Sequence, residues 1–212
     1  MSMSKAFTLL ETLVAVTLLT VAIAGPFAVA ERSFVAAAGA RDQLIASYLA
    51  QEGVEYVRAM RDSTYLAAVR DGKSDLTLTA FYTDFLFEDG GTSIPTTIRA
   101  CRDPDGDTIG DGFNGSDRTE PALCELDPGR PMGVGVGSAL TLCGSGACGR
   151  LYLTDDGRYT LDSGAGTITP FTRSIRFFDL SNSGEEVEVT VSWRSHGKLQ
   201  EVVVVGYLSA WQ

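Results

Sequence analysis

Apolar residues dominate the first part of the chain. Residues 7–30 read FTLLETLVAVTLLTVAIAGPFAVA and contain one charged side chain, Glu11. A helix of this length, at about 1.5 Å per residue, is long enough to cross the roughly 30 Å hydrocarbon core of a bilayer. The stretch therefore predicts a membrane-spanning helix with Lys5 on its cytoplasmic side.

The next stretch, residues 31–62, changes to an amphipathic pattern. Five apolar residues recur at roughly helical spacing between charged ones: Leu44, Tyr48, Leu49, Val54 and Val57. This spacing predicts that the helix continues beyond the membrane, carries one apolar face and ends near Asp62. We expect Gly25-Pro26 to kink or loosen it locally.

The middle of the chain has weaker patterns. Residues 63–100 include DLTLTAFYTDFLF, which suits either a strand or a short helix. Residues 101–149 are rich in Gly, Asp and Pro and show little periodicity. We therefore expect a long loop region between 101 and 149.

The last sixty residues alternate as strands do. The runs RLYLTDDGRYTLDSG, SIRFFDL, EEVEVTVSWRS and LQEVVVVGYLSAW are separated by turn residues. In VEVTVSW one face would hold Val187, Val189, Val191 and Trp193, and the other Glu188, Thr190 and Ser192. The SHGK stretch at 195–198 is a plausible hairpin turn between the last two strands.

These elements together predict an α+β fold. The amphipathic half of the helix needs an apolar surface to cover it, and an antiparallel sheet in the C-terminal part of the chain supplies one. We expect a globular head over residues 63–212, carried on a long N-terminal helix.

The net charge and the cysteines indicate which partners and which cellular compartment to expect. The formal net charge is −10, with lysines and arginines scattered, so direct nucleic-acid binding is not expected. All four cysteines, Cys101, Cys124, Cys143 and Cys148, follow the apolar segment. An even, clustered set of this kind predicts two disulfides in an oxidising, extracytoplasmic compartment.

The cysteine spacing leaves the pairing open. Cys143 and Cys148 bracket GSGA, which is short enough to bridge locally and would leave Cys101 with Cys124. Four cysteines nevertheless allow three connectivities. The alternative role for the four cysteines is a zinc site, but no histidine lies near them in the sequence and no paired C-x-x-C occurs.

The N-terminal residues carry the strongest functional signal. A basic residue, a small residue and then Phe-Thr-Leu-x-Glu open the apolar helix, and this KAFTLLE stretch resembles the processing site of type IV pilins and pseudopilins. The resemblance implies a leader of residues 1–6, cut between Ala6 and Phe7 by a prepilin peptidase that then methylates the Phe7 amine. Ala6 departs from the glycine most common there, by one methyl group.

Glu11 gains a role from the same resemblance, because the family places a glutamate at this point of the helix. A lone carboxylate in lipid costs several kcal/mol and is usually paired or protonated. The Phe7 amine of a neighbouring subunit, freed by cleavage, is the expected partner. The pair would select the axial register of assembly.

The resemblance also implies partners and location. These are other pilin subunits in a helical filament, the prepilin peptidase and an inner-membrane assembly platform. The subunit would sit in the cytoplasmic membrane with its head outside, and then in an extracellular or periplasmic filament. Type IV pilus, competence pilus and type II secretion pseudopilus remain open alternatives, and no enzymatic activity is expected.

Two other interpretations of the N-terminus remain. One is a signal peptide cut after AVA at 28–30, before Glu31; the other is an uncleaved anchor on an unrelated domain. Either would make the head a secreted or tethered enzyme or ligand-binding domain. Glu11 argues against a signal peptide, because a carboxylate early in the apolar core weakens insertion.

An acidic stretch within the loop region suggests a cation site. In CRDPDGDTIGDGFNGSD the spacing would allow a looped backbone to direct several oxygens to one point, from Asp103, Asp105, Asp107 and Asp111 and from the carbonyl of Ile109. Calcium takes six to eight such ligands. Thr108 and Asn114 depart from an EF-hand loop at its glycine and its last acid, and a solvated Asp-rich turn is the alternative.

The sequence offers little for catalysis. The only histidine, His196, falls in the expected hairpin turn. No G-x-S-x-G or phosphate-loop motif occurs, and nothing selects a carboxylate pair.

Overall fold

The computed structural model describes residues 8–72, 122–132, 138–144, 147–179 and 184–209, together with Phe85, Ile98 and Cys101. The chain divides into two compact units, Met1–Leu44 and Ile45–Gln212. The second unit is called the head. It begins inside the stretch 31–62, because helix residues from Ala46 onward contribute to its core.

One helix, α1, runs over Leu9–Arg70, and the expected end near Asp62 is wrong. Two hydroxyl groups just past that point donate to carbonyl oxygens four residues earlier: Ser63 to Ala59 at 2.7 Å and Thr64 to Met60 at 3.0 Å. Thr64 is also buried, so packing holds the following turns. The chain leaves the helix at Gly72, whose φ of 73° suits a residue without a side chain.

Helix α1 continues through Gly25 and Pro26, so the expected loosening there does not interrupt it. Proline removes one backbone hydrogen bond, here to the carbonyl of Ala22, at a cost of about 3 kcal/mol. The helical turns on both sides keep their own hydrogen bonds.

The buried face of α1 differs in part from the expected one. Leu49, Val54 and Val57 are buried, whereas Leu44 and Tyr48 are 58% and 68% exposed. The side chains buried instead include the small ones of Ala46, Ala50, Thr64 and Ala68, together with Met60. Small residues on this face allow the helix to approach the sheet closely.

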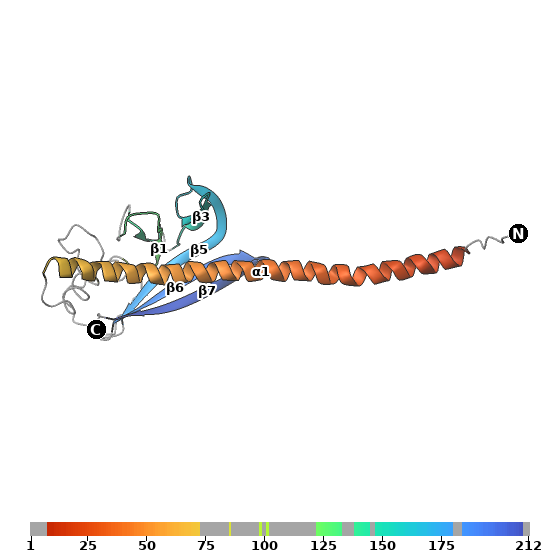
Figure 1. Cartoon of the computed structure of the whole chain (residues 1–212), viewed down its shortest axis with the longest axis horizontal. Helices are drawn as coiled ribbons and strands as arrows, with labels where there is room; N and C mark the ends of the chain where they lie inside the picture. Colours follow the sequence, from red (N-terminus) through yellow and green to blue (C-terminus); the bar gives the residue numbers. More distant parts are fainter. Residues whose placement is uncertain are drawn as a thin grey trace. The chain divides into compact units, whose positions relative to one another are not determined.

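Within the described residues, seven strands form one antiparallel sheet (Figure 1). They are β1 Cys124–Leu126, β2 Leu140–Leu142, β3 Arg150–Thr154, β4 Tyr159–Thr160, β5 Gly166–Asp179, β6 Glu185–Ser195 and β7 Lys198–Leu208. The long β5 pairs with β1, β3 and β6, while β7 pairs with β6. The predicted α+β class is confirmed.

The C-terminal hairpin follows the predicted pattern. Val187, Val189, Val191 and Trp193 are buried, and the residues between them are less so. β6 and β7 pair over their whole length, from Glu185 with Leu208 to Ser195 with Lys198. His196 and Gly197 form the turn with φ values of 51° and 78°. Positive φ at both central residues is typical of the turns that match strand twist.

Two parts of the sheet were not predicted. The region 101–149 contains the short strands β1 and β2, so it is not entirely loop. Strands of three residues are too short to show periodicity. β5 also begins earlier than SIRFFDL suggested and passes through Pro170, where the pairing with β3 shifts register. Such an irregularity accommodates a residue without an N–H group.

Helix and sheet approach each other closely at two glycines of the head. A Cβ on Gly53 would lie 2.8 Å from Cγ1 of Val189, and one on Gly206 would lie 2.5 Å from Cγ1 of Val54. These distances are shorter than a van der Waals contact. The two glycines therefore allow α1 to lie directly against β6 and β7.

Gly53→Ala is expected to destabilise the head by about 1 kcal/mol. Overpacking costs about 1–3 kcal/mol, and the better helix propensity of alanine returns about 1 kcal/mol. Gly39→Ala is the matched control, because nothing lies within 4 Å of its added Cβ. Thermal unfolding followed by near-UV circular dichroism in detergent measures both. Equal stabilisation by the two changes would contradict the close approach at Gly53.

Candidate functional site

The N-terminal part of α1 carries exposed apolar side chains along its length. The large ones are Leu9, Leu10, Leu13, Val14, Val16, Leu18, Leu19, Val21, Ile23, Phe27, Val29, Phe34 and Val35. By length and composition this helix is able to cross a membrane. A helix that is apolar on all sides needs apolar surroundings, which lipid or other helices supply.

Glu11 lies in the first turn of this helix and is exposed. Its N–H donates to the hydroxyl of Thr8 at 3.3 Å and to the carbonyl of Thr8 at 3.0 Å. The N–H of Thr12 donates to the same carbonyl at 3.2 Å. Thr8 therefore caps the helix.

The cap gives Glu11 a local role that the sequence interpretation missed. The TLLE stretch has the spacing of a capping box, in which a residue three positions after the cap helps to satisfy the free N–H groups. A carboxylate in the first turn also interacts favourably with the helix dipole. Any test of Glu11 must separate this local role from pairing with another subunit.

The residues that would complete the processing site, Lys5, Ala6 and Phe7, lie outside the described residues. Of the predicted processing and assembly residues, the structure therefore describes only Glu11. Cleavage and methylation remain predictions.

Three comparisons bear on the whole chain. No family model, no curated protein and no solved structure matches it. The resemblance to pilin processing sites therefore rests on the N-terminal residues themselves.

A buried arginine joins helix and sheet inside the head. Arg173, on β5, is 1% exposed. Its Nη1 donates to the carbonyl of Leu49 at 3.1 Å and to the carboxylate of Glu52 at 2.6 Å. Its Nη2 donates to the carbonyl of Leu126 at 2.8 Å. One side chain thus holds α1, β5 and β1 together, and we call this group the Arg173 clip.

The sequence itself indicates that Arg173 needs partners. Inward positions of β5 are apolar at Phe171, Ile175 and Phe177, with Arg173 between them. A charge at an inward position must find partners or destabilise the core. Burial lowers the pKa of the Arg173 guanidinium and the Glu52 carboxylate opposes this effect, but arginine stays charged at neutral pH.

Asp127 continues the polar network directly after β1. Its Oδ2 accepts hydrogen bonds from the Thr160 hydroxyl at 2.9 Å and the Leu161 N–H at 3.2 Å. Arg130 Nε lies 3.3 Å from the same carboxylate oxygen. The pKa of Tyr56 on α1 is raised, first by burial and then by the charge of Asp127. This buried carboxylate connects the end of β1 to β4.

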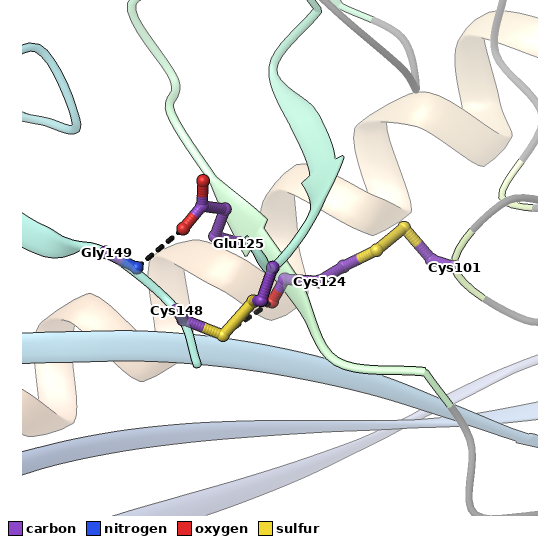
Figure 2. The surroundings of a disulfide bond; sticks show 6 residues. Cys101, Cys124, Glu125, Cys148 and Gly149 are labelled. Atoms are coloured by element: carbon purple, nitrogen blue, oxygen red, sulfur yellow. Dashed lines mark hydrogen bonds between the residues drawn. A yellow bond between two sulfur atoms is a disulfide. The ribbon is translucent and has the colours of Figure 1, made fainter. Parts of the chain in front are cut away.

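Two disulfides lie beside β1: Cys101–Cys124 and Cys143–Cys148. This pairing coincides with the one that the local spacing favoured. Figure 2 shows Cys148 next to Cys124, with Sγ of Cys148 3.8 Å from the Cys124 carbonyl oxygen. Glu125, the next residue of β1, accepts a hydrogen bond from the Gly149 N–H at 2.7 Å (Figure 2).

The acidic stretch lies outside the described residues, including Asp103, Asp105, Asp107, Ile109 and Asp111. Calcium binding there remains a prediction. Among the residues that the structure does describe, no group of three metal-ligating side chains occurs.

The single histidine takes part in the hairpin turn. His196 Nδ1 lies 3.1 Å from the hydroxyl of Ser195, its neighbour in the chain. The side chain thus has a local partner in the turn, and the contact suggests no chemistry.

Proposed function

We propose that this chain is a structural subunit, a minor pilin or pseudopilin, of a type IV pilus or type II secretion-like filament. One observation carries the proposal: an exposed apolar helix whose only charge between Thr8 and Ala30 is Glu11. An ordinary anchor needs the apolar surface, and it gains from the carboxylate only a contribution to the N-terminal cap of the helix.

The exposed helix suits two successive surroundings. In the membrane its apolar side chains contact lipid. In a filament the same side chains pack against the helices of neighbouring subunits. Because both surroundings are apolar, transfer between them changes the exposure of these side chains to water very little.

Glu11 supplies the specificity that apolar packing lacks. Hydrophobic contacts are non-directional, so many axial offsets between neighbouring helices are similar in energy. Pairing between the Glu11 carboxylate and the methylated Phe7 amine of a neighbour occurs at one offset only. The pair therefore selects register, the best-attested use of a buried charge.

The head supports an extracytoplasmic location. Two disulfides in a head of this kind indicate an oxidising compartment. Under the proposal the head lies outside the cytoplasmic membrane before assembly and on the filament afterwards.

The N-terminus of the protein purified from its native membrane tests the proposal. Mass spectrometry of the N-terminal peptide is expected to find N-methylated Phe7, and Ala6→Gly is expected to be cut at least as fast. A terminus at Glu31 would indicate a signal peptide, and one at Met1 or Ser2 an uncleaved anchor. Either result would overturn the proposal.

A further inference from the structure

The two disulfides of the head differ in exposure. Cys101 and Cys124 are completely buried. Cys143 and Cys148 are partly exposed. An incoming thiolate must reach a sulfur atom to open a disulfide, so exposure controls which pair reacts.

Among the described residues, those next to the exposed pair offer little obstruction to an incoming thiolate. Gly144, Ala147 and Gly149, which flank the two cysteines, are small and exposed. A Cβ added to Gly144 would meet nothing within 4 Å. By contrast, Cys101 and Cys124 belong to the hydrophobic core cluster, so a thiolate reaches them only when the core opens.

The number of residues between the paired cysteines has the opposite effect from exposure on how readily each disulfide opens. Cys143 and Cys148 are 5 residues apart, and Cys101 and Cys124 are 23 apart. After attack, the freed thiol of a short loop returns to its partner more readily, because closing a short loop costs less entropy. Loop length alone would thus protect Cys143–Cys148 from reduction. Selective reduction of this pair therefore requires the folded head, in which Cys101–Cys124 is buried.

The exposed pair lies in the connection between β2 and β3, and neither of its cysteines belongs to the hydrophobic core cluster. It follows β2 directly and lies just before β3. The N–H of Cys143 still donates to the carbonyl of Leu123 at 2.8 Å, and the Arg173 clip holds β1 from the other side. Opening this pair leaves Cys101–Cys124 in place.

We propose that Cys143–Cys148 is a thiol–disulfide exchange site on the head, acted on by a dithiol reductant. One thiolate of the dithiol attacks a sulfur of the pair, which breaks the Cys143–Cys148 bond and forms a mixed disulfide. The second thiolate then attacks the reductant's sulfur in the mixed disulfide, which breaks that bond, closes the reductant's own disulfide and releases the second cysteine as a thiolate. Each cysteine thiolate takes up a proton that the dithiol released on ionising, so two electrons and two protons pass in all, leaving Cys143 and Cys148 as thiols.

The test compares the two pairs in the full folded chain in detergent. Dithiothreitol is added, portions are alkylated with iodoacetamide over time, and the modified cysteines are counted by peptide mass spectrometry. Cys143 and Cys148 are expected to be alkylated at least about tenfold faster than Cys101 and Cys124. Equal rates, or faster reaction of Cys101 and Cys124, would overturn the proposal.

Two controls separate exposure from intrinsic reactivity. In concentrated guanidinium chloride, where burial is lost, the preference is expected to disappear or reverse. A preference that persists unchanged there would show that exposure in the fold is not its cause. The Cys143→Ser/Cys148→Ser variant is expected to keep the near-UV circular dichroism of the folded head, and an unfolded head would overturn the proposal.

Discussion

Glu11→Ala is expected to reduce incorporation of the chain into filaments by about a hundredfold or more while leaving cleavage intact. Removing one partner of a buried ion pair leaves the other charge uncompensated, at a cost of about 3–5 kcal/mol. Each 1.4 kcal/mol or so is a factor of ten in an equilibrium. Co-expression with the wild-type chain and quantification of each form in purified filaments measures the effect.

Two further variants separate charge pairing from helix capping. Glu11→Gln keeps a residue suited to a capping box but removes the charge. Thr8→Ala removes the hydroxyl that caps the helix, at about 1 kcal/mol, and keeps the charge. We expect Glu11→Gln to fail as Glu11→Ala does, and Thr8→Ala to assemble almost normally. The reverse pattern would assign Glu11 to capping and remove the proposed pairing.

Arg173→Ala is expected to lower the free energy of unfolding of the head by about 3–5 kcal/mol. The change deletes a fully buried side chain and leaves the carbonyls of Leu49 and Leu126 without its hydrogen bonds. Each hydrogen bond from a charged donor contributes about 1.5–3 kcal/mol. The Glu52 side chain is 45% exposed, so water solvates part of its freed charge. Urea unfolding followed by near-UV circular dichroism measures the loss.

Arg173→Met is the matched control for the Arg173 clip. Methionine fills much of the same volume without a charge, and apolar replacement of buried ion pairs is often neutral. We expect Arg173→Met to lose much less stability than Arg173→Ala. The double variant Arg173→Met/Glu52→Gln is expected to be only slightly less stable than Arg173→Met alone. If Arg173→Ala unfolds at the wild-type urea concentration, the clip does not hold helix and sheet together.

The hydrophobic pattern predicted the elements in which a regular alternation of apolar and polar residues extends over many consecutive positions. The apolar stretch and the helical spacing after it indicated one long helix, and the alternation in VEVTVSW indicated β6 and its buried face. SHGK indicated the hairpin turn, because His196 and Gly197 supply its positive φ angles. These signals depend on neighbouring residues only.

Short strands and the helix end depended on distant contacts. β1 and β2 form because partners are available: Cys124 pairs with both Leu142 and Ile175. Helix α1 passes Asp62 because Thr64 and Ala68 are buried in the head. Local propensity does not contain this information, since the stabilising contacts come from elsewhere in the chain.

The sequence by itself determined a long apolar helix with one carboxylate, an antiparallel C-terminal hairpin and an α+β class, because side-chain period alone specifies these. Only the tertiary structure decided which face of α1 is buried, since Gly53 and Gly206 allow close approach where Leu44 and Tyr48 do not take part. It also decided the partners of Arg173 and the exposure of each disulfide. Burial is a property of the assembled core, and no single segment carries it.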